Sequence, residues 1–409
     1  MVKVLSSFVR GPLEPHMAGF AEALLAQGYS RTSAAQHVCF IAHLDRWMGA
    51  EGIGLDGLSG SVIERYLAVR RAAGYREYRS VKALRPLLDH LAPLGVLPVP
   101  PEVLPGRVED LLGRFREYLV GERGLTAGTA RGYVDCVRPF IAGRLRGDVL
   151  DLAGITAGDV TGFVLTACPG RAVGSAKLIV CGLRALLRWL HLTGVIAVPL
   201  AAAVPSVAGW RLTGLPKGLE PERLRLLLAA PDRRTTTGRR DYAVLLLLAR
   251  LGLRAGEVAR LGLDDIDWRV GELTVLGKGD RGERLPLPVD VGAAIAAYLR
   301  RGRPGTAQDR SVFVRVHAPH RTLTTGGVTM IVFDAAQRAG LGRIYAHRLR
   351  HTAATAMLRA GSPLSEVGQV LRHRSPLSTA IYAKVDRDAL AVLARPWPVQ
   401  PLERAGGVS

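Results

Sequence analysis

The stretch HRLRHTAATAMLRAG, at residues 347–361, decides the architecture of the second half of the chain. Its alanine, leucine and arginine residues favour a helix, and Gly361 is expected to end it. His347 and Arg350 are three positions apart, so a helix places them on one face. An imidazole and a guanidinium on one face can flank a single phosphate. We therefore expect a phosphate-handling site to include this helix.

Two further motifs frame this helix, GLRAGE at 252–257 and SPLSTAIY at 375–382. Arg254 lies at the junction of two expected helices, where its planar fork can hold two nonbridging phosphate oxygens. Glu257 is expected to orient that helix or the arginine. His373 lies 23 residues after Arg350 and nine before Tyr382. Ser375 with Pro376 suits a helix start, which would turn Tyr382 toward the site.

Lys278 lies in a GKGDRG turn between the expected strands GELTVLG and ERLPLPV, so the pair is predicted to form a hairpin. The chain holds 55 basic residues, of which six are lysines and 49 are arginines. A lysine in so arginine-rich a chain suggests a position where arginine will not serve. A general acid must release its proton, which a guanidinium with a pKa above about 12 cannot do at neutral pH.

Tyr382 needs help to act as a nucleophile, because a phenol ionises near pH 10. Two arginines and two histidines would provide a cationic field that favours the phenolate and stabilises charge on the phosphate oxygens. The alternative for Tyr382 is a half-buried packing aromatic. For Arg254, the alternative is a solvated surface arginine.

The order and spacing of Arg254, Lys278, His347, Arg350, His373 and Tyr382 resemble the active site of the tyrosine recombinases, also called phage integrases. The resemblance covers about half the chain. It implies that Arg350 clamps the phosphate and that His347 assists proton transfer. His351 also belongs to the family's HxLRH pattern, but we expect it to be a buried structural histidine outside the catalytic set. VLRH at 370–373 departs from the family's usual leucine, glycine, histidine, because Arg372 takes the glycine's place.

A metal site is the rival interpretation, since His347, His351 and His373 could serve as ligands and an HxxxH pair brings two imidazoles together. The acid of an HExxH motif is missing, and Arg348 would oppose a bound dication. We expect neither a metal nor a cofactor.

The net charge of +20 suits a polyanionic partner. It is divided into +13 for residues 217–409 (31 basic, 18 acidic) and +7 for residues 1–216 (24 basic, 17 acidic). No apolar run near 18 residues and no secretory signal is evident, so a cytoplasmic protein with no membrane partner is expected. The four cysteines have no CxxC pairing, which argues against a zinc ribbon or a disulfide framework.

The first two blocks of the chain look alike. Phe20 and Phe115 occupy matching positions 95 residues apart, and Gly95 and Gly194 match at 99. Ser30 and Thr126 are each expected to cap the second helix of their block. We predict two helical bundles of one design, although similar bundles can also converge on such a pattern.

The fold class predicted is mainly α: two N-terminal helical bundles precede a mixed α+β catalytic domain with a small antiparallel sheet. The resemblance implies that the bundles are of the SAM-like core-binding type. The expected boundaries are 1–104 for the first bundle, 105–205 for the DNA-binding core-binding bundle, 217–393 for the catalytic domain and 394–409 for an irregular tail. The first bundle would bind DNA or another subunit, or would be an interaction domain that never meets DNA.

By resemblance, the chain is a site-specific recombinase or integrase of a mobile element, which acts in DNA recombination, integration or transposition. It would cleave and rejoin double-stranded DNA through a 3′-phosphotyrosyl intermediate, as a homo-tetramer on two sites, alone or with related recombinases. Two alternatives stay open. One is a type IB topoisomerase-like relaxing enzyme, and the other is a catalytically silent DNA-binding accessory or regulatory protein.

Overall fold

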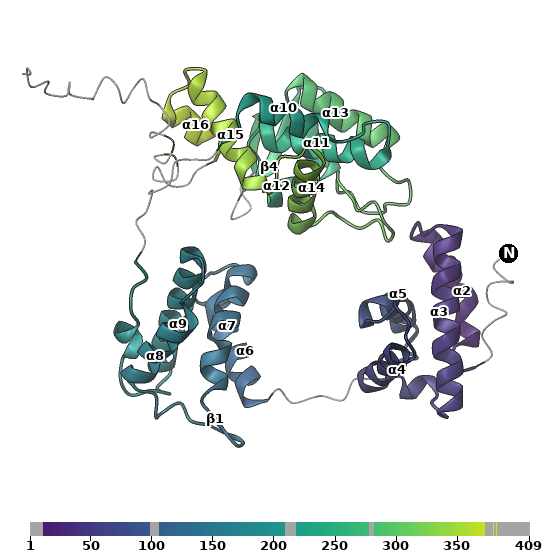
Figure 1. Cartoon of the computed structure of the whole chain (residues 1–409), viewed down its shortest axis with the longest axis vertical. Coiled ribbons are helices and arrows are strands. Elements are labelled where there is room, and N and C mark those ends of the chain that lie inside the picture. The colour runs from purple at the N-terminus through teal and green to yellow at the C-terminus, as the bar shows by residue number, and fades with distance from the viewer. Residues whose placement is uncertain are drawn as a thin grey trace, which may run out of the picture. The chain divides into compact units, whose positions relative to one another are not determined.

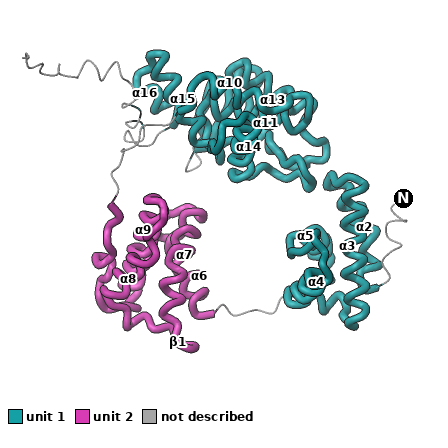
Figure 2. The backbone as a smooth tube through the Cα atoms, in the orientation of Figure 1, with its two compact units in different colours: residues 1–99, 214–409 teal, residues 100–213 magenta. Residues whose placement is uncertain are grey.

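The computed structural model describes residues 11–98, 106–208, 218–277 and 282–372, together with Thr379 and Tyr382 (Figure 1). The chain forms two compact units, of which one contains Met1–Val99 with Gly214–Ser409 and the other Pro100–Thr213 (Figure 2). No helix in the described ranges is both long enough and apolar enough to cross a membrane.

The first block is a helical bundle with a hydrophobic core of its own, centred on Phe20, Ile41 and Leu67. Its elements are α2 (Glu14–Ala26), α3 (Arg31–Ala50), η1 (Leu55–Gly57), α4 (Gly60–Ala72), α5 (Val81–Leu91) and η2 (Ala92–Leu94).

The second block repeats this helical order around a separate core. Its elements are α6 (Arg107–Gly121), α7 (Ala127–Ala142), the strand pair β1 (Leu145–Arg146) and β2 (Val149–Leu150), α8 (Ala157–Ala167), α9 (Val173–Leu192) and η3 (Leu200–Ala203). Both predicted caps are confirmed, because Ser30 Oγ and Thr126 Oγ1 each accept a hydrogen bond from the backbone N–H three residues later, at 3.1 and 3.3 Å. Phe20 and Phe115 are both buried. These matches support a common design of the two bundles.

The third block surrounds helix α11, which packs against α10, α12, α13, α14 and α15 (Figure 1). Leu245 and Leu248 of α11 are buried, as is Leu251, which follows it. The helices are α10 (Pro221–Ala229), α11 (Thr236–Arg250), α12 (Ala255–Arg260), η4 (Leu263–Asp265), α13 (Val289–Arg301), α14 (Thr325–Arg338), α15 (Ala346–Arg359) and α16 (Leu364–Val370).

A three-stranded antiparallel sheet completes this block, in the order β3 (Ile266–Asp267), β4 (Glu272–Leu276) and β5 (Gly282–Pro286). The pairing of β4 with β5 confirms the predicted hairpin, whose register joins Leu276 to Gly282. The turn residues 278–281 lie outside the described residues. The fold is therefore mainly helical with small antiparallel sheets, as expected.

Candidate active site

Arg254 lies at the junction between α11 and α12, as predicted, and Glu257 holds it there. The backbone N–H of Arg254 donates to Glu257 Oε2 at 2.8 Å, and its Nη1 donates to Glu257 Oε1 at 2.6 Å. Glu257 therefore orients both the helix start and the arginine. The Arg254 side chain remains 43% exposed while that of Glu257 is 3% exposed. The Arg254 side chain is thus anchored by Glu257 and remains partly exposed.

Arg350 in α15 is buried, with 1% of its surface exposed. Its Nη1 donates to the carbonyl oxygen of Gly252 at 2.6 Å, and its Nη2 donates to that of Leu371. Burial and the nearby Arg254 lower the pKa of Arg350 to about 10, so it stays charged at neutral pH. In this structure Arg350 joins three chain segments, a structural role that the sequence does not predict.

The hydrogen bond from Arg350 to the carbonyl oxygen of residue 252 depends on the glycine at that position. Its φ of +59° lies in the left-handed region, and a Cβ there would lie 2.6 Å from Leu371 Cδ2. The glycine of GLRAGE therefore brings its carbonyl within reach of Arg350.

His351 contacts the predicted nucleophile, although a structural role alone was predicted for it from the sequence. Its Nδ1 lies 2.8 Å from the Tyr382 hydroxyl. Its ring also lies against that of His347, with centroids 4.4 Å apart at 73°. The sequence feature that could have indicated a role for His351 in the site is its position one turn beyond His347 on the same helix.

Tyr382 is 1% exposed and packs with Ala354, Val367 and Leu371 in a small apolar cluster. Burial raises the pKa of Tyr382, and the charge of Arg350 only partly opposes this. In this structure burial therefore favours the neutral phenol. Of the two histidines expected to add positive charge, His347 has a pKa lowered by burial, and His373 lies outside the described residues. Burial with His347 and Arg350 lowers the pKa of His351 to about 4.

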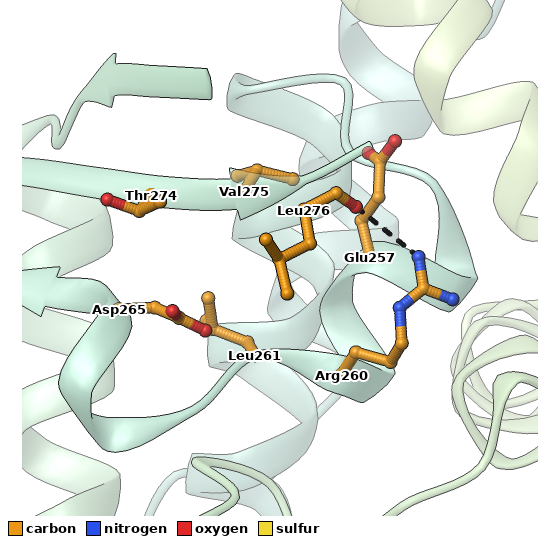
Figure 3. A pocket seen from close by; sticks show the side chains of 7 residues that line it. All are labelled: Glu257, Arg260, Leu261, Asp265, Thr274, Val275 and Leu276. Atoms are coloured by element: carbon orange, nitrogen blue, oxygen red, sulfur yellow. Dashed lines mark hydrogen bonds between the residues drawn. The ribbon is translucent and has the colours of Figure 1, made fainter. Parts of the chain in front are cut away.

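Lys278 and His373 lie outside the described residues, so their expected places in the site stay predictions. The strand that leads to Lys278 is anchored by Arg260, whose Nη2 donates to the Leu276 carbonyl oxygen at 3.3 Å. Figure 3 shows both residues beside a small open hollow that is lined by residues of α12 and β4.

Arg372 adopts a φ of +56°, a left-handed conformation that glycine takes without strain. At position 372 the backbone therefore takes the left-handed conformation that suits the family's usual glycine, although the residue there is an arginine. As for metals, the described part of the chain contains no group of three histidine, cysteine, aspartate or glutamate side chains able to hold one.

Comparison with known proteins identifies the family. Residues 217–388 match the model of the phage integrase family. The putative integrase/recombinase y4rA of Sinorhizobium fredii is 40% identical over 399 residues, which cover 96% of this chain and 97% of that protein. Tyrosine recombinase XerD of Mycobacterium tuberculosis is 31% identical over 293 residues, which cover 68% of this chain and 93% of that protein.

Two solved structures share the fold. One is the XerH site-specific recombinase in a post-cleavage complex with palindromic difH substrate, with a TM-score of 0.57 and 18% identity, covering 71% of this chain and 97% of that one. The other is a lambda integrase tetramer bound to a Holliday junction, with a TM-score of 0.52 and 17% identity, covering 80% of this chain and 91% of that one. With its four motifs and the arginine–histidine–tyrosine grouping described above, this chain belongs to the phage integrase family and is a tyrosine-type site-specific recombinase.

Proposed function

We propose that Tyr382 is the nucleophile that attacks a phosphodiester of double-stranded DNA. The phenol loses its proton, its oxygen bonds to phosphorus, and the bond from phosphorus to the 5′ oxygen breaks. Lys278 donates a proton to the leaving oxygen, so the products are a 3′-phosphotyrosyl link and a free 5′-hydroxyl. The observation that carries this proposal is the contact of the Tyr382 hydroxyl with α15, the helix that also bears His347 and Arg350.

The other site residues act on the phosphate. Arg254, whose fork is partly exposed, would hold the nonbridging oxygens, and Arg350 would clamp the second side with His347 and His373 beside it. Since the energy of the broken bond is kept in the phosphotyrosyl link, a second 5′-hydroxyl can reverse the step without ATP. No cofactor or metal enters this scheme.

Strand exchange between two DNA sites requires two cleavages in each duplex. We therefore propose a homo-tetramer on two recombination sites, alone or with related recombinases. The lambda integrase tetramer on a Holliday junction supports this assembly, since that protein has the same fold. A cytoplasmic location gives access to such DNA, and a mobile element is the expected context.

The domain boundaries of the sequence analysis remain proposals. Residues 105–205 would clamp DNA opposite the catalytic domain at 217–393, with 394–409 as a tail outside the described residues. The shared caps and core positions support residues 1–104 as an additional DNA-binding or subunit-contact module of the same design. The recombinase relatives disfavour the topoisomerase-like and catalytically silent alternatives.

The test uses nicked suicide substrates that carry the DNA site bound by the chain, which trap the covalent intermediate. Tyr382→Phe should abolish the covalent complex while DNA binding persists. Tyr345→Phe is the matched control, because Tyr345 is exposed and immediately precedes α15. A covalent complex that persists in Tyr382→Phe would remove this tyrosine as nucleophile.

The role of Lys278 needs a different substrate. A sulfur at the 5′-bridging position makes a leaving group that requires no proton. Lys278→Ala should cleave this substrate at close to the wild-type rate while failing on the normal phosphodiester. If the sulfur does not rescue the variant, Lys278 is not the general acid.

A further inference from the structure

Arg372 has a backbone conformation that is unfavourable for any residue with a Cβ atom. It follows α16 and its φ is +56°; among the described residues Tyr78 is the other non-glycine residue with a positive φ. A side chain in the left-handed region is strained, and glycine would remove that strain. Some interaction of the Arg372 side chain must therefore offset the strain.

That interaction is an ion pair with Glu257. Arg372 Nη2 lies 2.8 Å from Glu257 Oε2, and the two side chains are only 2% and 3% exposed. The other oxygen of the same carboxylate, Oε1, accepts from Arg254 Nη1. Glu257 therefore bridges the two arginines, with one oxygen toward each guanidinium.

Arg372 also contacts Arg254 through its backbone. Arg254 Nη2 donates to the Arg372 carbonyl oxygen at 3.4 Å. The Arg254 guanidinium is thus held on one side by Glu257 and on the other by the residue that pairs with Glu257. These two contacts hold the Arg254 guanidinium in a defined orientation.

The net charge around the buried Glu257 carboxylate depends on whether residue 372 is an arginine. Arg254, Arg350 and Arg372 with Glu257 carry three positive charges and one negative, a net of +2. With glycine at position 372 the net would be +1, and Arg254 would be the remaining arginine in direct ion-pair contact with the buried carboxylate. A carboxylate attracts the guanidinium that should stabilise the charge developing on the phosphate oxygens.

We infer that Arg372 is a positioning residue for the recombination reaction: by pairing with Glu257 it frees the charge of Arg254 for the scissile phosphate. In this structure the buried guanidinium of Arg372 makes its contacts to protein atoms. Its Nη1 donates to the Val370 carbonyl oxygen at 2.9 Å, and its Nε has no partner among the described residues. This inference rests on the proposed function of Arg254.

The test compares two substrates. One has the normal scissile phosphate, and the other has a methylphosphonate there, which lacks the negative charge on which Arg254 acts. Arg372→Met removes the guanidinium and keeps a side chain in the left-handed conformation, whereas Arg372→Gly also relieves the strain. Both variants should cleave the normal phosphate about 10- to 100-fold more slowly in single turnover, with a much smaller loss on the methylphosphonate.

The matched control is Arg240→Met. Asp241, like Glu257, is a buried carboxylate between two arginines, with Arg240 at 2.7 Å and Arg338 at 3.9 Å. This control should lower the thermal unfolding temperature without changing the ratio of the two cleavage rates. Arg254→Ala provides the reference, and adding Arg372→Gly to it should cause little further loss, because Arg372 acts through Arg254.

Two results would overturn the inference: wild-type cleavage by Arg372→Gly, or an equal loss on both substrates, which would indicate a structural role alone. Failure of the proposed function is distinguishable, because the wild-type chain would then form no covalent complex with either substrate.

Discussion

His351 makes the stability of the catalytic core depend on pH. The groups around His351 determine whether stability rises or falls with pH. Burial, with the neighbouring His347 and Arg350, lowers the pKa of His351 from 6.5 to about 4. The unfolded chain therefore takes up this proton first as the pH falls. The contribution of His351 to the free energy of unfolding is therefore fully present above pH 6.5. This contribution is lost as the pH falls from 6.5 to about 4.

The size of the effect follows from the same shift. At about 1.36 kcal/mol per unit, the change from 6.5 to about 4 corresponds to roughly 3.4 kcal/mol as an upper limit. His351 is only partly buried, so solvent screening reduces this to about 1–2 kcal/mol. His347 contributes in the same direction, because its pKa is also lowered.

The perturbation is His351→Asn, which keeps a hydrogen-bonding group near the position of Nδ1 and cannot titrate. Hydrogen exchange of α15 amides, corrected for intrinsic rates, should show a loss of opening free energy between pH 7 and 4.5 in the wild type. The loss should be smaller by about 1–2 kcal/mol in the variant. A His351 ring that titrates near 6.5 by NMR, or an equal pH dependence in both proteins, would refute this reasoning.

Three further substitutions test contacts that α15 makes with other segments, two of them at Arg350 and one at Thr352. Arg350→Lys keeps a charge but cannot reach the carbonyls of both Gly252 and Leu371, so denaturant unfolding should show a loss of about 2–3 kcal/mol, with cleavage reduced at least tenfold. Gly252→Ala places a Cβ 2.6 Å from Leu371 Cδ2 at a positive φ, and should cost about 1–3 kcal/mol in the same assay. Thr352→Val leaves the Leu219 N–H, now bonded to Thr352 Oγ1 at 2.8 Å, without its acceptor, and should cost about 1–3 kcal/mol.

The fold could be predicted because its signals are local. The Ser30 and Thr126 caps depend on a hydroxyl three residues before the N–H it accepts from, and the β4–β5 hairpin depends on alternating residues around a glycine-rich turn.

The inner arrangement of the site could not be predicted, because it depends on contacts between distant segments. The bond of His351 to Tyr382 spans 31 positions, and that of Arg372 to Glu257 spans 115. Sequence spacing placed His351 on the right helix but did not show that Tyr382 folds back onto it. For Arg372, the departure from the family's glycine was visible, but the carboxylate it pairs with was not.

The state of Tyr382 bears on how the reaction begins. Its phenol is buried with a raised pKa, and the imidazole beside it, with a pKa of about 4, is a weak base. Bringing a phosphate alone would add negative charge and disfavour the phenolate further. Among the described residues, Arg350 is the cation that lowers the pKa of this phenol, and its effect is smaller than that of burial. Ionisation of Tyr382 therefore has to overcome its burial against Val367 and Leu371, because burial affects its pKa more than the opposing charge of Arg350 does.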